Sequence, residues 1–168
     1  VEVIGNIDDG IEFFGGTVNA SNLVVWYQGD DAYDIDQAYS GTISNIAYIA
    51  GSDSDHGMEI DGPEGSANAT GAFTIQNGKF MGGKGEYADF RDGARGTVKD
   101  LFFFGYTAGD DLEIDDATSA ANYTAMDLTI ENNVFDTTGT MGATIASIAN
   151  DKSGTLATFD TDFAANNT

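Results

Sequence analysis

The chain has 168 residues, of which 41% are hydrophobic and 11% aromatic, enough to build the core of one domain and to exclude a disordered segment. Its 28 Asp and Glu residues outweigh 6 Lys and Arg residues, giving a formal net charge of −22. Because such a polyanion is repelled by phosphate groups, we expect no nucleic-acid partner and no anionic lipid partner.

Cysteine is absent, which excludes disulfides, thiolate metal sites and cysteine nucleophiles. No apolar run reaches the length of a membrane span, so we expect no membrane insertion. The chain starts at Val1 rather than at Met, and we expect it to be a processed piece of a longer protein.

The first predicted element is a five-residue segment that reads acid, small or polar, apolar, acid, apolar. It begins as Asp9-Gly10-Ile11-Glu12-Phe13 and recurs, with some substitutions, at 31–35, 56–60, 86–90 and 110–114. The closing apolar residue falls at 13, 35, 60, 90 and 114, in steps of 22 to 30 residues. We predict that these five residues stack inside the fold, because a repeat of this kind buries its apolar face against its neighbours.

A second element starts with Thr and an apolar residue, as in Thr42-Ile43-Ser44-Asn45-Ile46. Its copies place a polar residue at equivalent positions: Asn22, Asn45, Asn77, Asp100 and Asn132. At the same corner of successive coils, such side chains could bond backbone groups of the turn and one another. We therefore predict a structural ladder here rather than a binding site.

These strand-length segments alternate in polarity and are broken by Gly, Asn and Asp, with no room for a periodic helix within a repeat. The prediction is an all-β fold, a right-handed parallel β-helix (β-solenoid) of about five to seven coils with 22–32 residues per coil. Residues 1–168 form one domain in this prediction. The repeat matches over 6–116, and 117–168 are divergent terminal coils, a cap or a subunit contact.

Acid-rich bends are the most suggestive functional feature. Stacked on successive coils, their like charges would repel one another, and a hard cation held by several oxygens would relieve the repulsion. No motif requires a cofactor, but calcium is the natural candidate for these bends, with these residues as ligands: Asp30, Asp31, Asp34, Asp36, Asp53, Asp55, Glu59, Asp61, Asp110 and Asp111. The alternative is a solvated acidic face screened by salt, since neither an EF-hand loop nor a nine-residue calcium repeat is matched.

The single histidine, His56, allows two interpretations. It could act as a general acid or base beside Asp55, or it could simply replace the Asp or Ala of other copies, which we favour. The only basic groups that a polysaccharide lyase could recruit are Arg91, Arg95 and Lys99, and the net charge would repel a polyuronate. We therefore predict no catalytic residue and favour a protein that is not an enzyme.

A glycan-active or glycan-binding β-helix is the main alternative. Its sugar platforms would be aromatic residues exposed beside the acids: Trp26, Tyr27, Tyr33, Tyr39 and Tyr48. An ice-binding solenoid is a more distant alternative, because the sequence shows no regular threonine ladder.

The segments Asp8–Asn19, Asp30–Asp31 and Asp36–Thr42 resemble a group of bacterial surface proteins with right-handed parallel β-helix repeats. These proteins are common in Bacteroidetes and marine bacteria, and most are known only as hypothetical proteins or lipoproteins. The resemblance covers residues 6–116, although Ala38 replaces the first Gly of their Gly-Tyr-Ser-Gly segment. It implies export, an extracellular or cell-surface location and calcium binding, but no reaction.

Taken together, these features predict an extracellular structural or adhesive module of a cell-surface or filament-forming protein, stabilised by calcium. The expected partner is another copy of the chain, stacked end to end or in a filament, or else an extracellular glycan. The alternative function is a glycan-binding or polysaccharide-degrading β-helix, either hydrolase or lyase.

Overall fold

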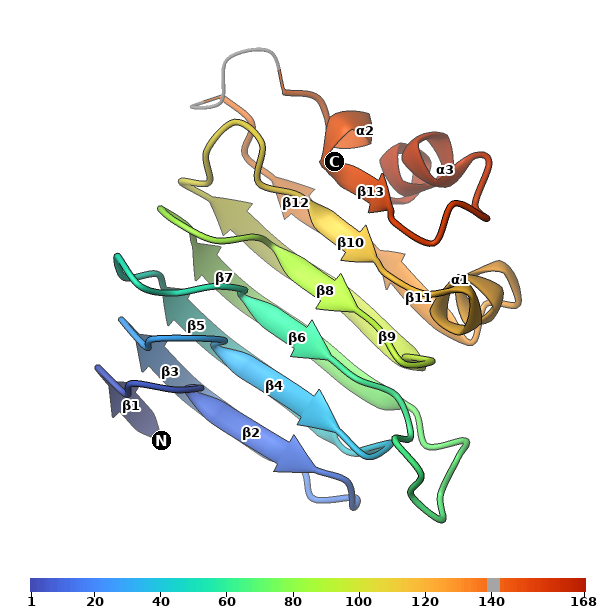
Figure 1. Ribbon diagram of the computed structural model, residues 1–168. Helices are drawn as coiled ribbons and strands as arrows, with labels where there is room; N and C mark the ends of the chain where they lie inside the picture. The colour runs from blue at the N-terminus through green and yellow to red at the C-terminus, as the bar shows by residue number, and fades with distance from the viewer. Residues whose placement is uncertain (139–142) are drawn as a thin grey trace.

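The computed structural model describes residues 1–138 and 143–168. The chain winds as a parallel β-helix in which two parallel sheets face each other across one core (Figure 1). From β1 to β11, consecutive strands alternate between the two sheets, so each coil contributes one strand to each. The all-β, right-handed solenoid predicted from the repeat is the fold of this chain.

We call the sheet at the back of Figure 1 sheet A. Its strands, in spatial order, are β1 (Glu2–Ile4), β3 (Ala20–Trp26), β5 (Thr42–Ile49), β7 (Phe73–Met81), β9 (Gly96–Phe104) and β11 (Leu128–Glu131). A short strand, β12 (Val134–Phe135), also pairs with β9. All of these pairs are parallel.

Sheet B lies at the front of Figure 1 and has six strands. They are β2 (Ile11–Phe14), β4 (Tyr33–Asp36), β6 (Met58–Ile60), β8 (Ala88–Phe90), β10 (Leu112–Ile114) and β13 (Ala149–Asp151). Their pairing is parallel throughout. Six stacked strands agree with the predicted number of coils.

The core lies between the sheets, because alternate residues of every strand point inward. Sheet B contributes the column predicted from the repeat: Phe13, Ile35, Ile60, Phe90 and Ile114. All but Phe13 are almost fully buried. Sheet A contributes an aromatic column in which the Phe80 and Phe103 rings are 5.0 Å apart and the Phe103 and Phe135 rings 4.7 Å apart. These rings therefore stack along the inside of sheet A.

Sheet A bends at one position in each coil. The register aligns the five residues of the predicted ladder at this bend, with φ between 54° and 58°: Asn22, Asn45, Asn77, Asp100 and Asn132. A positive φ is left-handed backbone, which Asn and Asp tolerate better than other residues with a Cβ. Their side chains are exposed, and within residues 1–138 and 143–168 no hydrogen bond joins one of them to another. The shared property of these residues is therefore a backbone conformation.

Threonines form a column on the outer face of sheet A that the sequence analysis did not recognise. Its members are Thr42, Thr74, Thr97 and Thr129. The adjacent outward column is Ser44, Gln76, Lys99 and Glu131. The chain therefore does carry a threonine column, which was expected to be missing, but the column beside it consists of mixed polar and charged residues.

The segment 117–168 contains helices that the repeat pattern did not predict: α1 (Ala117–Thr124), α2 (Ile145–Ile148) and α3 (Phe159–Asn166). Asp116 caps α1 by accepting the backbone N–H groups of Thr118 and Ser119. Helix α3 lies at the upper end of the stack in Figure 1, and its Phe163 ring packs 5.3 Å from that of Phe135. None of the helices in the described part of the chain has the length and apolarity needed to cross a bilayer.

Candidate cation-binding face

A column of acids runs across the outer face of sheet B. In each strand the acid lies between two inward-facing residues, so strand alternation directs it away from the core. The register places these residues side by side: Glu12, Asp34, Glu59, Asp89 and Glu113, followed by Asn150. We call the five acids the carboxylate column. Neighbouring members are separated by one strand spacing, roughly 4.8 Å.

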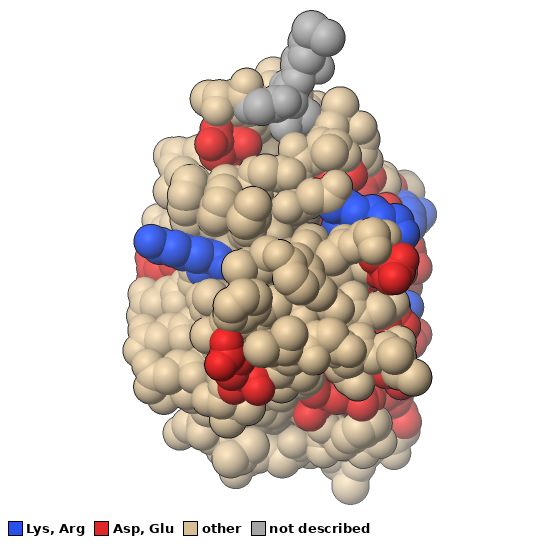
Figure 2. All heavy atoms as spheres, turned by 90° about the vertical axis from the view of Figure 1, so that its left-hand side faces the viewer, with Lys and Arg blue, Asp and Glu red and all other residues tan. Residues whose placement is uncertain are grey.

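The acidic side chains gather on the sheet B side of the molecule. In the view of Figure 2 this side is at the right-hand edge, where most of the acidic groups in that view are found, while the middle is largely uncharged. Despite facing outward, Asp34 is only 7% exposed, Asp89 5% and Glu113 2%. The structure therefore combines dense negative charge with restricted access to water.

Burial changes the acidity of these carboxyl groups, because desolvation disfavours the charged form. Burial and the nearby charges of Asp36 and Asp9 raise the pKa of Asp34 to about 8. Burial, with Asp36 again nearby, raises the pKa of Glu12 to about 7, and burial raises that of Asp89 to about 6. Ionising all of these groups together is unfavourable unless a proton or a cation neutralises part of the charge.

Several sets of three side chains bring their ligand atoms within 4.8 Å of one another. Five of these sets are Asp8/Asp9/Asp30, Asp9/Glu12/Asp34, Asp30/Asp31/Asp55, Asp31/His56/Glu59 and Asp36/Asp61/Glu64. These five sets include seven of the ten ligands proposed from the sequence. They also include five residues that were not proposed as ligands: Asp8, Asp9, Glu12, His56 and Glu64. Oxygen-rich sets of this kind suit hard cations such as calcium.

The other three proposed ligands do not belong to these five sets. Asp53 is an exposed residue in the loop between β5 and β6. Asp110 accepts the backbone N–H of Thr107 at 2.5 Å, which stabilises a tight turn. Asp111 accepts an N–H of Asn150 at 2.8 Å.

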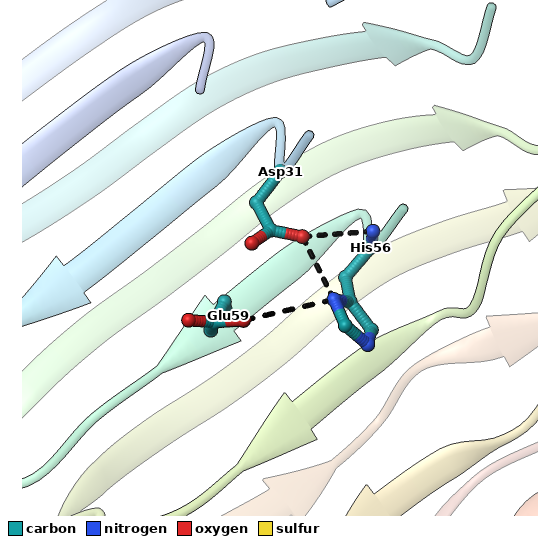
Figure 3. Close-up of side chains that lie close together, drawn as sticks. All are labelled: Asp31, His56 and Glu59. Atoms are coloured by element: carbon teal, nitrogen blue, oxygen red, sulfur yellow. Dashed lines mark hydrogen bonds and ion pairs between the residues drawn. The ribbon is translucent and has the colours of Figure 1, made fainter. Parts of the chain in front are cut away.

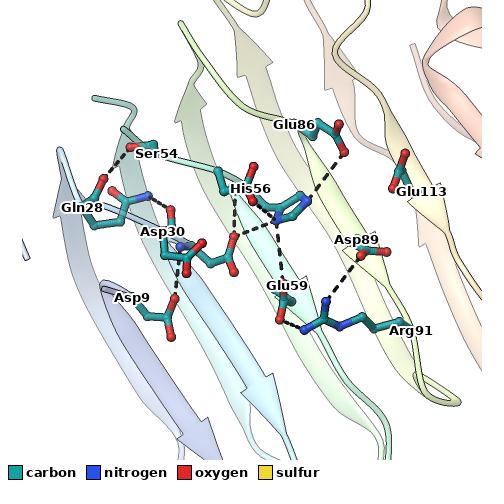
Figure 4. A network of polar contacts seen from close by, with 12 residues as sticks. Asp9, Gln28, Asp30, Ser54, His56, Glu59, Glu86, Asp89, Arg91 and Glu113 are labelled. Carbon is teal, nitrogen blue, oxygen red and sulfur yellow. Dashed lines mark hydrogen bonds and ion pairs between the residues drawn. The ribbon is translucent and has the colours of Figure 1, made fainter. Parts of the chain in front are cut away.

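Basic side chains lie on the later coils of the same face (Figure 4). The Arg91 guanidinium contacts Glu59, and its Nε is 2.6 Å from Asp61 Oδ1. The Lys152 ammonium contacts Glu113, and this contact raises the pKa of Lys152. These residues supply positive charge to the carboxylate column from within the chain.

His56 occupies the centre of the face (Figure 3). Its Nδ1 is 2.8 Å from Asp31 Oδ1, an oxygen that also accepts the His56 backbone N–H at 2.8 Å. Asp55, the partner considered from the sequence, is more distant at 3.8 Å, and Nε2 lies 3.6 Å from Glu86 Oε2. Burial lowers the pKa of His56, but the hydrogen bond and charge of Asp31 outweigh it and raise the pKa to about 9. His56 is therefore protonated at neutral pH and acts as a third internal cation.

Three members of the column were not among the ligands proposed from the sequence: Glu12, Asp89 and Glu113. The signal was present, since the fourth residue of every five-residue element is acidic. The acids of the bends occur in runs, whereas this acid occurs singly within each strand.

The proposed aromatic platform is wrong for three of its five residues. Tyr33, Tyr39 and Tyr48 are at most 1% exposed and belong to the core. The Tyr33 hydroxyl donates to the backbone carbonyl of Ala47 at 2.9 Å, which satisfies its polar end inside the fold. Only Trp26 and Tyr27 remain partly accessible, and they lie at the end of β3 in sheet A rather than on the acidic face.

The fold and this face define a parallel β-helix with a carboxylate-bearing sheet. The family model of the pectate-lyase-like β-helix domain matches residues 1–168, so the chain belongs to that family. No match was found among curated proteins, and none among solved structures.

Proposed function

We propose that the chain is an extracellular β-helix module with a structural or adhesive role at a cell surface, stabilised by calcium on its acidic face. The observation that supports this is the carboxylate column, in which Asp34, Asp89 and Glu113 are nearly inaccessible to water. A column of neighbouring carboxylates is costly unless cations relieve its repulsion. Calcium is a common cation outside cells and prefers oxygen ligands.

The resemblance to exported bacterial surface proteins supports the location. A stack of coils is also suited to a mechanical or adhesive role, since it presents side chains in regular columns along one axis. The proposed partner is either another copy stacked end to end or an extracellular glycan. Electron microscopy of the purified chain distinguishes these cases, because self-stacking predicts filaments whereas glycan binding alone predicts separate particles.

Thermal unfolding tests the calcium part of the proposal. The chain is treated with a chelator and then melted with calcium chloride or with sodium chloride at equal ionic strength, which controls for screening. A ligand at about 100 times its Kd stabilises the folded state by about 2.7 kcal/mol. For a domain of this size we expect calcium to raise the Tm by about 5–10 °C above the sodium control. Equal Tm values would contradict the proposal.

Polysaccharide binding or cleavage is the second candidate. Membership of the pectate-lyase-like family favours it, and the cationic groups of His56 and Arg91 on the acidic face could contact an anionic sugar. The test is incubation with neutral and uronic-acid polysaccharides in the presence of calcium. Retarded migration in polysaccharide-containing gels would support binding, and new reducing ends would support cleavage. The absence of both would contradict this candidate.

A further inference from the structure

The carboxylate column is compensated unequally along its length. In its later coils, Arg91 contacts Glu59 and lies 4.0 Å from Asp89, while Lys152 contacts Glu113. His56 adds a cationic group 3.8 Å from Glu59. Each of these three acids therefore has a positive charge beside it that the chain itself provides.

The first two coils have no such compensation. Residues 1–78 contain no Lys or Arg, and in the described part of the chain no basic side chain forms an ion pair with Asp9, Glu12 or Asp34. The nearby charges that act on Asp34 come from other acids. At this end of the column, neutralisation of the carboxylates depends on protons or on a cation from outside the chain.

Asp34 supplies a second, independent indication. Its side chain is more than nine-tenths buried, with 7% exposed, yet its Oδ1 has no hydrogen-bond partner within the described residues. Asp89 Oδ1 also has none, but Asp89 has Arg91 beside it, whereas Asp34 forms no ion pair with a described basic side chain. A buried carboxylate oxygen without a partner is costly, so native structures normally satisfy it with a donor or an ion. The ligand atoms of Asp9, Glu12 and Asp34 lie within 4.8 Å of one another, close enough to share one ion.

We propose that Asp9, Glu12 and Asp34 bind a single calcium ion between β2 and β4, and that the internal cations make the later coils independent of metal. This inference rests on the proposed calcium-binding function and assigns it to one site. Three carboxylates and no nitrogen or sulfur ligand favour a hard cation over zinc or copper. Water would complete the coordination on the open side, where Glu12 is exposed.

Calcium titration of the whole chain by calorimetry tests the assignment. The variant is Asp34→Asn, and the matched control is Asp89→Asn, which alters an equally buried member of the same column beside Arg91. We expect one calcium ion per wild-type chain, at least a tenfold loss of affinity in Asp34→Asn, and less than a twofold change in Asp89→Asn. Glu12→Gln, at an exposed position, is a second site variant with little effect on folding and should also weaken binding.

Melting temperatures with and without calcium distinguish a calcium ligand from a residue that is needed only for folding. In chelator, Asp34→Asn should melt no lower than the wild type, because it replaces a buried carboxyl group beside other acids with a neutral amide. With calcium the wild type should melt above Asp34→Asn, since only the wild type gains stability. If the wild type binds calcium but Asp34→Asn and Glu12→Gln bind it equally well, this site assignment is overturned while the proposed function stands. If the wild type binds no calcium, both are overturned.

Discussion

Asp34 and Asp89 occupy equivalent positions in one column, with Glu59 between them, yet only Asp89 lies beside a cation. Arg91 Nη1 is 4.0 Å from its Oδ2, whereas Asp34 has only acids as charged neighbours. Two carboxylates with the same backbone setting and similar burial, both with acidic neighbours, thus differ in whether a cation lies beside them. The difference shows where the chain compensates its own charge and where it does not.

Replacing Arg91 with Met should extend the requirement for calcium to the later coils. The substitution removes the guanidinium that lies beside Glu59, Asp61 and Asp89. Because a partly buried ion pair is broken, we expect the free energy of unfolding in chelator to fall by about 1–3 kcal/mol. Calcium should restore more stability to this variant than to the wild type. Thermal unfolding with and without calcium measures both effects. Arg95→Met, which removes a single pair with Asp127, is the control and should show no added calcium response.

His56 should make stability depend on alkaline pH. Its folded pKa of about 9 exceeds the ordinary value of 6.5, so its contribution is complete below pH 6.5 and is lost as the pH rises through 9. The Tm of the wild type should therefore fall more steeply between pH 7 and pH 10 than that of His56→Gln. Melting curves across this range test the prediction, and parallel curves would contradict it.

The aromatic column should be the most sensitive part of the core. Phe80 is fully buried and contacts the rings of Tyr33, Tyr48 and Phe103. Phe80→Ala should therefore lower the free energy of unfolding, measured with urea, by about 3–5 kcal/mol. Phe102→Ala is the control, because Phe102 lies on the outer face of sheet A and is partly exposed. Its loss should be less than half as large. Similar losses would mean that ring burial is not the main source of stability here.

At the bend in sheet A, the effect of a substitution on stability should depend on how well the new residue tolerates left-handed backbone. Asn45 has a φ of 54°, so Asn45→Val should cost about 1–2 kcal/mol, since a β-branched residue is strained in left-handed backbone. Asn45→Gly should be close to neutral because glycine adopts this conformation freely. Urea unfolding of both variants measures the difference. Equal losses would instead indicate that the Asn45 side chain itself is required.

Much of the fold could be predicted because the repeat has a physical cause. Every coil needs an apolar residue at the same inward-facing position of sheet B. Apolar residues therefore recur in the sequence at the spacing of the repeat, as Phe13, Ile35 and Ile60 do. Asn at the bend is similarly informative, because few residue types tolerate its backbone. Helix α1 could not be predicted this way, since it interrupts the repeat and depends on the local cap at Asp116.

The site was harder to predict than the fold. Sequence spacing groups acids by coil, but it does not show which of them are shielded from water or which cation lies beside them. Arg91 reaches Glu59 across 32 residues, and only the stacking of coils creates that contact. Tyr33 and Tyr48 were misassigned for a related reason, because an aromatic residue in a strand can face either side.

The stack also has a direction. Strands contact mainly the strands of adjacent coils, so opening of one coil need not disturb coils further away. Helix α3 packs against one end of the stack, and the Asp9, Glu12 and Asp34 cluster lies in the coils nearest the other (Figure 1). An ion bound there would stabilise these coils against local unfolding. It would slow amide hydrogen exchange in β2 and β4 and have progressively less effect toward β10. Calcium would thus set how far unfolding penetrates from that end rather than the stability of every coil equally.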